Sequence, residues 1–246
     1  MNRVVYDKYG NKSVHVPQNI VFYDEDGYKI LMNTNREIIG NGLYGVVYRY
    51  TNDKCLKYIT NTSNTNLDAI KVIKNADLLS FYKIYKLLFD KYQEFNGYIM
   101  KYYDSRYVDI LTMPTSYTLD NFSDMLHDTK ILSEKGIYMR DMHSENVIMD
   151  NNKITIIDAD NYSFYDTDNL LDKNMKALRY LFYDIYIDSI HRHHDMSKRE
   201  YDMIRLLFNH KEDESLYKEL KNYKYPIDYI KKKSLEPVKY VMKKGV

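Results

Sequence analysis

The pattern of the sequence changes near residues 101–106, and this change limits the folds that the chain can adopt. Before it, short β-branched and aromatic runs alternate with glycine and Asn-Asp turns, which is typical of antiparallel strands. After it, apolar residues recur at helical spacing over 117–136 and again beyond residue 170. With no repeats and no low-complexity linker, a strand-rich first half and a helix-rich second half predict an α+β protein with two unlike parts.

The strand-rich half predicts hairpins and one inserted helix. Two β-prone runs flank Asp26-Gly27, a dipeptide that favours a tight turn because glycine tolerates positive φ. Further strands are predicted at 37–39, 46–50, 54–59, 81–89 and 98–103. Residues 64–74 carry apolar side chains at helical spacing. We expect an N-terminal hairpin extension at 1–32, a lobe with an antiparallel sheet and one helix at 33–100, a hinge at 101–106, and a mainly helical lobe at 107–246.

Composition excludes several classes of partner. The 246 residues include 36 Lys and Arg against 35 Asp and Glu, so the net charge of +1 gives no basic excess for nucleic acid. No apolar run is long enough to span a bilayer, and the first ten residues lack the apolar core of a signal peptide. The single cysteine, Cys55, permits no intrachain disulfide and fits a reducing compartment. We therefore expect a cytoplasmic protein with neither nucleic acid nor membrane as partner.

The first chemical motif is a GxGxxGxV string that contains Gly40, Gly42, Gly45 and Val47. In dinucleotide-binding folds such glycines lead from a strand into a helix. Here they lead from one strand run into another, so they would cap a hairpin and let its backbone approach a triphosphate closely. The alternative is a tight glycine turn without a ligand.

The second motif is Lys57, which stands between apolar residues in the middle of a predicted strand. Burying an ammonium group without a partner is costly, so such a lysine needs a carboxylate and, in a nucleotide site, a phosphate. Asp68, near the start of the inserted helix, is the carboxylate that we pair with it. The alternative is a lysine that faces solvent on an edge strand.

The third motif is an RDxxxxN string followed by a predicted hairpin with an Asn-Asn turn and an Ile-rich strand that ends in an acid. This order would bring Asp141, Asn146 and Asp158 to one edge of the hairpin. Their hard oxygen atoms suit Mg²⁺ carrying a phosphate, since Mg²⁺ takes one or two carboxylates plus phosphate oxygens. The alternative is a set of polar turns in a surface loop.

Together these motifs resemble, in the same order, those of the eukaryotic-type protein kinases over roughly residues 33–190. The resemblance implies a bilobal protein kinase-like fold that binds ATP and Mg²⁺. It implies that the glycine loop covers the phosphates and that Lys57 holds them while pairing with a helix acid. It also implies that Asp141 orients the acceptor hydroxyl, and that Asn146 and Asp158 hold the metal.

The resemblance also places a hinge. Met100 would be the gatekeeper at the end of the last strand of the small lobe, and the backbone of Lys101, Tyr102 and Tyr103 would contact the adenine edge. A second register puts the hinge at Met113-Pro114. It leaves too little chain before the RD motif for the helices normally found there.

Several positions depart from the family pattern. Met139 stands where the family has the His of HRD, Asp68 replaces a Glu, and Asp158-Ala159-Asp160 replaces DFG. There is no APE string, and the helical pattern resumes near Leu170. The segment after Asp158 is thus too short for a phosphorylated activation loop with a peptide-docking platform, so we do not expect regulation of that kind.

The catalytic loop also reads as DxHxxN, which resembles that of aminoglycoside and choline kinases. His143 is the residue specific to that pattern; its alternative is a packing or capping role. We expect an atypical, minimal bacterial or phage member of the kinase-like superfamily, a phosphotransferase that moves the γ-phosphate of ATP to a hydroxyl acceptor on a protein or a small molecule. The rival hypothesis is a pseudokinase that binds nucleotide or a partner protein without turnover.

A histidine-rich stretch follows the main helical pattern of the second half. It contains His191, His193, His194 and Asp195. Adjacent residues rarely coordinate one ion well, so we interpret the stretch as a solvated turn between helices rather than a metal site.

Overall fold

The computed structural model describes residues 2–6, 13–42, 44–104, 108–192, 197–199 and 221–235. The chain divides into two compact units. Unit 1 comprises Met1–Asp77, Phe81–Asp104 and Asp160–Tyr162, and unit 2 comprises Leu78–Ser80, Ser105–Ala159 and Ser163–Val246. The chain therefore enters unit 2 briefly after the first helix, and Asp160–Tyr162 return to unit 1 from within the second half of the sequence.

Unit 1 is built on a seven-stranded antiparallel sheet that forms a half-barrel. In spatial order its strands are β4 (Lys29–Asn33), β3 (Asn19–Asp24), β8 (Ile84–Phe89), β9 (Phe95–Lys101), β7 (Lys54–Ile59), β6 (Gly45–Arg49) and β5 (Ile38–Asn41). The predicted turn at Asp26-Gly27 joins β3 to β4, with Gly27 at a φ of 82°. The strands predicted from the sequence are thus confirmed, although β8 begins three residues later than expected and β9 covers 95–101 instead of 98–103.

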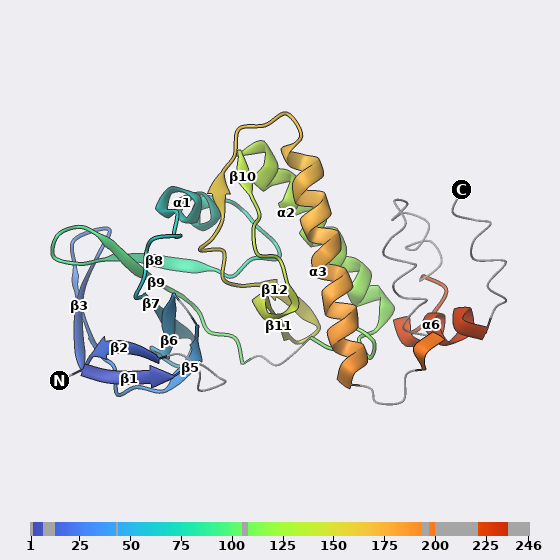
Figure 1. Cartoon of the computed structure of the whole chain (residues 1–246), viewed down its shortest axis with the longest axis horizontal. Coiled ribbons are helices and arrows are strands. Elements are labelled where there is room, and N and C mark those ends of the chain that lie inside the picture. Colours follow the sequence, from blue (N-terminus) through green and yellow to red (C-terminus); the bar gives the residue numbers. More distant parts are fainter. Residues whose placement is uncertain are drawn as a thin grey trace. The chain divides into compact units, whose positions relative to one another are not determined.

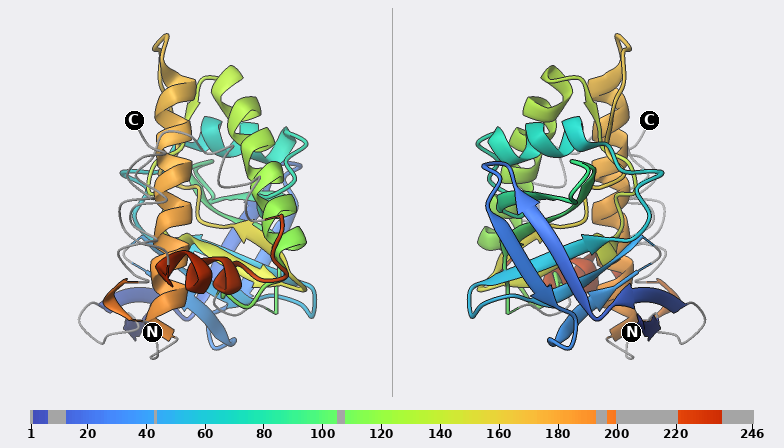
Figure 2. Two further views of the ribbon diagram at one scale, coloured as in Figure 1. Left: turned by 90° about the vertical axis from the view of Figure 1, so that its right-hand side faces the viewer. Right: turned by 90° about the vertical axis from the view of Figure 1, so that its left-hand side faces the viewer.

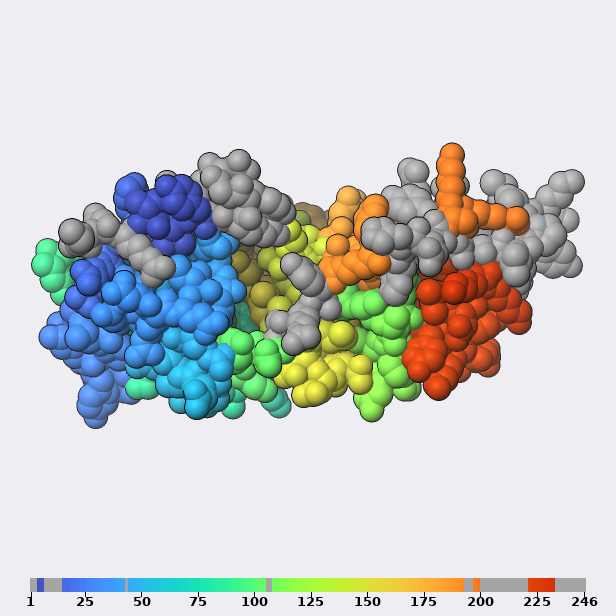
Figure 3. Space-filling view, turned by 90° about the horizontal axis from the view of Figure 1, so that it is seen from below, coloured from blue at the N-terminus to red at the C-terminus, as the bar shows by residue number. Residues whose placement is uncertain are grey.

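Two further elements cover the sheet of unit 1. Strands β1 (Asn2–Tyr6) and β2 (Ser13–Pro17) form an antiparallel hairpin; within the N-terminal extension expected at 1–32, only the hairpin around Asp26-Gly27 was predicted. Helix α1 (Leu67–Asn75) contacts β8, and the side chain of Asn66 caps it by accepting a hydrogen bond from the N–H of Ala69 at 3.0 Å. In Figure 1 the helix and the hairpin are labelled beside the sheet, and Figure 3 shows the hairpin in dark blue over the paler strands.

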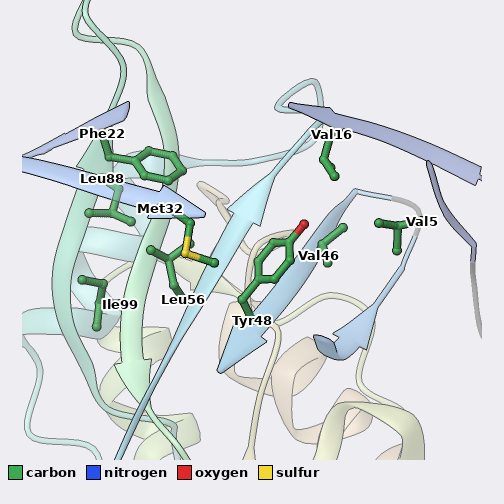
Figure 4. Packing of buried hydrophobic residues seen from close by; sticks show 9 residues of the cluster. All are labelled: Val5, Val16, Phe22, Met32, Val46, Tyr48, Leu56, Leu88 and Ile99. Carbon is green, nitrogen blue, oxygen red and sulfur yellow. The ribbon is translucent and has the colours of Figure 1, made fainter. Parts of the chain in front are cut away.

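One face of the sheet carries the hydrophobic core of unit 1. The buried cluster contains Val5, Val16, Phe22, Met32, Val46, Tyr48, Leu56, Leu88 and Ile99. Figure 4 shows that the two valines from the β1–β2 hairpin point toward Val46 and Tyr48. The hairpin therefore closes the core beneath the glycine-bearing strands β5 and β6. Burial of apolar side chains in this way stabilises a fold by about 25 cal/mol for each Å² removed from water.

Unit 2 is mainly helical. Its helices are α2 (Thr115–Glu134), α3 (Leu170–Arg192) and α6 (Pro226–Leu235), so the described residues contain four α-helices in all. Helices α2 and α3 run side by side in Figures 1 and 2, and the rings of Phe122 and Phe182 join them at a centroid distance of 3.9 Å. Gly136, at a φ of 75°, follows the end of α2 as predicted.

Two short strand pairs accompany these helices. Strands β11 (Val147–Asp150) and β12 (Lys153–Ile156) form the predicted hairpin, and both turn residues, Asn151 and Asn152, have positive φ. Strand β10 (Ile137–Tyr138) pairs with β13 (Ser163–Phe164). Among the described residues, no helix is long and apolar enough to cross a membrane.

A close approach of two strands makes Gly97 indispensable in unit 1. A β-carbon at this position would lie 2.0 Å from the carbonyl oxygen of Lys57. We expect Gly97→Ala to lower the free energy of unfolding by about 2 kcal/mol or more, because the backbone of β7 cannot give way cheaply. Denaturant unfolding followed by tyrosine fluorescence measures this change.

Gly42→Ala is the matched control. A β-carbon there would meet nothing within 4 Å, so its stability should stay within about 0.5 kcal/mol of the parent protein. Equal losses in the two variants would contradict the close approach at Gly97.

Candidate functional site

The glycine motif forms the turn of the β5–β6 hairpin, as the sequence predicted. The N–H of Gly42 donates to the carbonyl oxygen of Gly45 at 3.0 Å. A β-carbon at Gly45 would lie 2.5 Å from the carbonyl oxygen of Tyr58, so glycine is required there by the neighbouring strand β7. At Gly40 and Gly42 a β-carbon would meet no close contact, so the space beside the backbone is open at these two positions.

Lys57 lies in the central strand β7, in a row of directly paired residues. Val47 of β6 and Tyr98 of β9 pair with it on either side. Residues paired directly across antiparallel strands share a face, so these side chains lie on the face opposite the hydrophobic core. Cys55 lies two residues earlier on the same face, pairs with Met100, and is buried. Burial raises the pKa of its thiol to about 12, so it behaves as a neutral apolar group.

The ammonium group of Lys57 is buried and paired with Asp160. Its Nζ lies 2.6 Å from Oδ2 of Asp160, and the two side chains are 8% and 4% exposed. Oδ1 of the same carboxylate accepts a hydrogen bond from the hydroxyl of Tyr98 at 2.8 Å. The hydroxyl of Tyr82 donates in turn to that of Tyr98 at 3.2 Å. A buried carboxylate that is both paired and hydrogen-bonded avoids most of the cost of desolvation.

The predicted partner of Lys57 was wrong. Asp68 lies in the first turn of α1 with its side chain 72% exposed, and it pairs with Lys71 at 3.0 Å. The buried face of α1 consists of Ala69, Ile70 and Ile73, so apolar side chains occupy the face on which a lysine partner was expected. An acid in the first turn is favourable next to the positive end of the helix dipole, which accounts for Asp68 without a ligand.

The predicted hinge residues stand at the end of β9. Met100 is partly exposed on the face that carries Lys57. The N–H of Lys101 donates to the carbonyl oxygen of Lys83 at 2.9 Å, and the N–H of Tyr102 donates to that of Asp53 at 2.8 Å. These N–H groups are already paired within the protein. The backbone atoms of Lys101 and Tyr102 that could contact an adenine are therefore their carbonyl oxygens.

In unit 2 the RD motif forms a compact polar loop. Nε2 of His143 lies 3.4 Å from Oδ1 of Asp141 and 3.1 Å from Nδ2 of Asn146. Nδ2 of Asn146 also donates to the backbone carbonyl of Asp141 at 2.8 Å, which closes the loop on itself. The structure therefore brings together three of the residues that the sequence singled out, and the amide nitrogen of Asn146, rather than its oxygen, makes the contacts within the loop.

Asp158 follows the β11–β12 hairpin. The N–H of Ile157 donates to the carbonyl oxygen of Asn146 at 2.8 Å, so Asp158 comes directly after a residue tied to the polar loop. Asp141 and Asp158 have φ angles of 59° and 61°, a region that side-chain-bearing residues populate sparsely. Such backbone conformations cluster at functional sites, where the surrounding structure holds them in place.

Helix α3 supports this loop through two side chains. The buried Asn174 accepts from the N–H of Met139 at 2.9 Å and donates to the carbonyl of Ile137 at 2.8 Å and to Oγ of Ser133 at 2.9 Å. Asp184 accepts from the N–H of Ser144 at 2.6 Å. Two polar residues of one helix thus fix the chain before and after Asp141.

The part of the chain that the structure describes contains no cluster of three His, Cys, Asp or Glu residues suited to a metal ion. His191 lies in the last turn of α3, whereas His193, His194 and Asp195 lie outside the described residues. The proposed ligands Asn146 and Asp158 are of the kind that shares Mg²⁺ with phosphate oxygens rather than enclosing it.

Sequence reasoning missed several residues that organise these sites. Asp160 was noted only as a departure from DFG, and Tyr98, Gly97, Asn174 and Asp184 were given no role. The signal available for Asp160 was its position as a second acid two residues after a predicted metal ligand. Nothing in the sequence distinguishes Asn174 from the other asparagines of a chain that is rich in them.

Comparisons with known proteins identify no relative for this chain: no protein-family model matches it, and no curated protein is similar to it in sequence. The functional argument therefore depends on the geometry of the chain itself.

The bonds of Asn174 predict a large effect of a small change. Asn174→Ala would leave the N–H of Met139 and the carbonyl of Ile137 buried without a partner. We expect a loss of about 2–3 kcal/mol in the free energy of unfolding of unit 2, measured by chemical denaturation. Lys176→Ala, an exposed position on the same helix, is the control and should change stability by less than about 0.5 kcal/mol. Similar losses for both would show that Asn174 does not brace the loop.

Proposed function

We propose that this protein is an ATP- and Mg²⁺-dependent phosphotransferase of the protein kinase-like fold, which transfers the γ-phosphate to a hydroxyl acceptor. The observation that carries the proposal is the buried, carboxylate-paired ammonium of Lys57 on the sheet face next to the glycine turn. A buried lysine at this position is expensive to maintain and has no role in the hydrophobic core, which lies on the other face.

The residues of unit 1 suit the nucleotide. The β5–β6 turn can approach phosphates through its backbone because Gly40 and Gly42 lack side chains, and Lys57 would neutralise phosphate charge. Val47 and Met100 are partly exposed apolar residues on the same face, beside the buried Cys55, and such a surface suits an adenine ring. The resemblance assigns these roles in the same order along the chain.

The residues of unit 2 suit the transfer step. Asp141 would orient the acceptor hydroxyl and accept its proton, with His143 beside it at 3.4 Å. Asn146 and Asp158 would bind Mg²⁺ through oxygen atoms, and the metal would offset charge on the phosphates when bound. Because Nδ2 of Asn146 is engaged by Asp141 and His143, its oxygen is the atom that faces a metal in this proposal.

A bilobal kinase arrangement is part of the proposal. Unit 1 supplies an antiparallel sheet with one helix, unit 2 is mainly helical, and their long segments join at Asp104–Ser105. Catalysis would require both units to act on one Mg·ATP, by positioning and electrostatics rather than by covalent chemistry. The turnover experiment below measures transfer to both protein and small-molecule acceptors.

The second candidate is a nucleotide-binding protein without turnover. Ala159 stands where the family carries the Phe of DFG, and Met139, which replaces the catalytic-loop His, is buried. Binding and turnover must therefore be measured separately.

Nucleotide binding is the first test. Mg·ATP at millimolar concentration should raise the melting temperature of the purified protein, because a ligand that binds only the folded state stabilises it by mass action. Lys57→Met and Asp158→Asn should abolish the rise, and so should removal of Mg²⁺ with a chelator. Lys71→Met, which removes an exposed lysine of α1, should preserve it. The absence of any shift in the parent protein would sink both candidates.

Turnover is the second test. ATP hydrolysis or autophosphorylation should fall by about 100-fold or more in Asp141→Asn, the effect typical of losing a general base. Asp172→Asn, an exposed acid on α3, is the control and should keep the parent rate. A protein that binds Mg·ATP but shows no hydrolysis or transfer to protein or small hydroxyl acceptors would favour the second candidate.

A further inference from the structure

We infer that Asp160, and not an acid of helix α1, is the residue that positions Lys57 for the phosphates of the nucleotide. The inference rests on the proposed function, because it assigns a role within that site. It departs from the expectation set by the kinase resemblance, in which a helix acid holds the lysine. It also places the positioning acid two residues after Asp158, the proposed metal ligand.

Lys57 and Asp160 form a close, buried ion pair. Lys57 and Asp160 approach to 2.6 Å, and both side chains are nearly inaccessible to water. Asp68 has its own partner, Lys71, on the exposed side of α1. In a site of low polarity a charge-assisted contact of this length fixes the position of the ammonium group.

Other groups fix the carboxylate in turn. The hydroxyl of Tyr98 donates to Oδ1 of Asp160 and leaves Oδ2 for the lysine. Tyr98 pairs directly with Lys57 across β7 and β9, so one strand pair supplies both of these groups. The arrangement is thus an oriented acid rather than a chance surface contact.

The cap of helix α1 contacts the backbone of Asp160. The N–H of Asn66, the cap of α1, donates to the carbonyl oxygen of Asp160 at 3.3 Å. The helix therefore helps to hold the Asp160 segment in place, while the charge that faces Lys57 comes from that segment.

An ammonium group has three N–H donors, so it can contact a carboxylate and a phosphate oxygen at the same time. The same tripeptide, Asp158-Ala159-Asp160, then carries the metal ligand and the lysine partner, and Ala159 between them is fully buried. One short segment therefore carries both the partner of Lys57 and the proposed metal ligand.

The experiment measures the reactivity of Lys57 without nucleotide and the affinity for Mg·ATP separately. Amine acylation with an N-hydroxysuccinimide ester, read by peptide mass spectrometry between about pH 7 and 10, gives the apparent pKa of Lys57. The exposed Lys83 is the internal reference. The variants are Asp160→Asn, Asp160→Glu and, as the matched control on α1, Asp68→Asn.

Asp160→Asn should lower the apparent pKa of Lys57 by about one unit or more, because burial disfavours an ammonium group that has lost its carboxylate. The acylation rate near neutral pH should rise about tenfold, and the affinity for Mg·ATP should fall about tenfold. Asp68→Asn should change neither. Asp160→Glu, which keeps the charge, should retain the parent pH profile and guards against a folding defect in the amide variant. A general loss of structure would instead raise the acylation rate of Lys57 at every pH without changing its apparent pKa.

Three results would overturn the inference in different ways. A shift of the profile in Asp68→Asn but not in Asp160→Asn would restore the helix acid as the partner. A shifted profile in Asp160→Asn with unchanged Mg·ATP affinity would make the ion pair structural only. A shifted profile in Asp160→Asn, together with no binding of Mg·ATP by the parent protein, would refute the proposed function while leaving the Lys57–Asp160 pair in place.

Discussion

The buried ion pair between Lys57 and Asp160 is the interaction on which unit 1 depends. Removing both charges from water costs several kcal/mol, and only close geometry and further hydrogen bonds repay it. The structure supplies both, with a contact of 2.6 Å and a hydroxyl from Tyr98 on the other carboxylate oxygen. Gly97 belongs to the same arrangement, because its missing side chain lets β9 approach the backbone of Lys57. The centre of the sheet is thus organised around one charged pair.

In unit 2, buried polar side chains fix the backbone of segments that lack regular structure. Asn174 satisfies backbone groups on both sides of Tyr138, and the buried Asp128 accepts from the N–H groups of Leu79 and Ser80 and from the hydroxyl of Ser80. Each of these side chains supplies the hydrogen bonds that backbone N–H and C=O groups would otherwise make within a strand or helix. Conformations such as that of Asp141, with its positive φ, persist only where the surroundings are fixed in this way.

Local patterns predicted the elements of this fold well, and pairings between distant segments poorly. The turns at Asp26-Gly27 and Asn151-Asn152 were predicted because glycine and asparagine tolerate positive φ, and that preference belongs to a few neighbouring residues. The β1–β2 hairpin was not anticipated, and neither was the order of strands in the sheet, in which β3 pairs with β8. Such contacts depend on which apolar faces meet, and period-two alternation does not specify a partner strand.

The error at Asp68 has the same physical origin. The need of Lys57 for a carboxylate follows from the cost of a buried charge and could be predicted, but the position of that carboxylate depends on which residues return to the sheet from far along the chain. Asp160 returns to unit 1 from the second half of the sequence, after the β11–β12 hairpin. Asp160 does not lie on a helix: the buried Ala159 precedes it, and its carbonyl oxygen accepts a hydrogen bond from the N–H of Asn66. The short segment after Asp158 therefore supplies the carboxylate at the charged centre of the sheet.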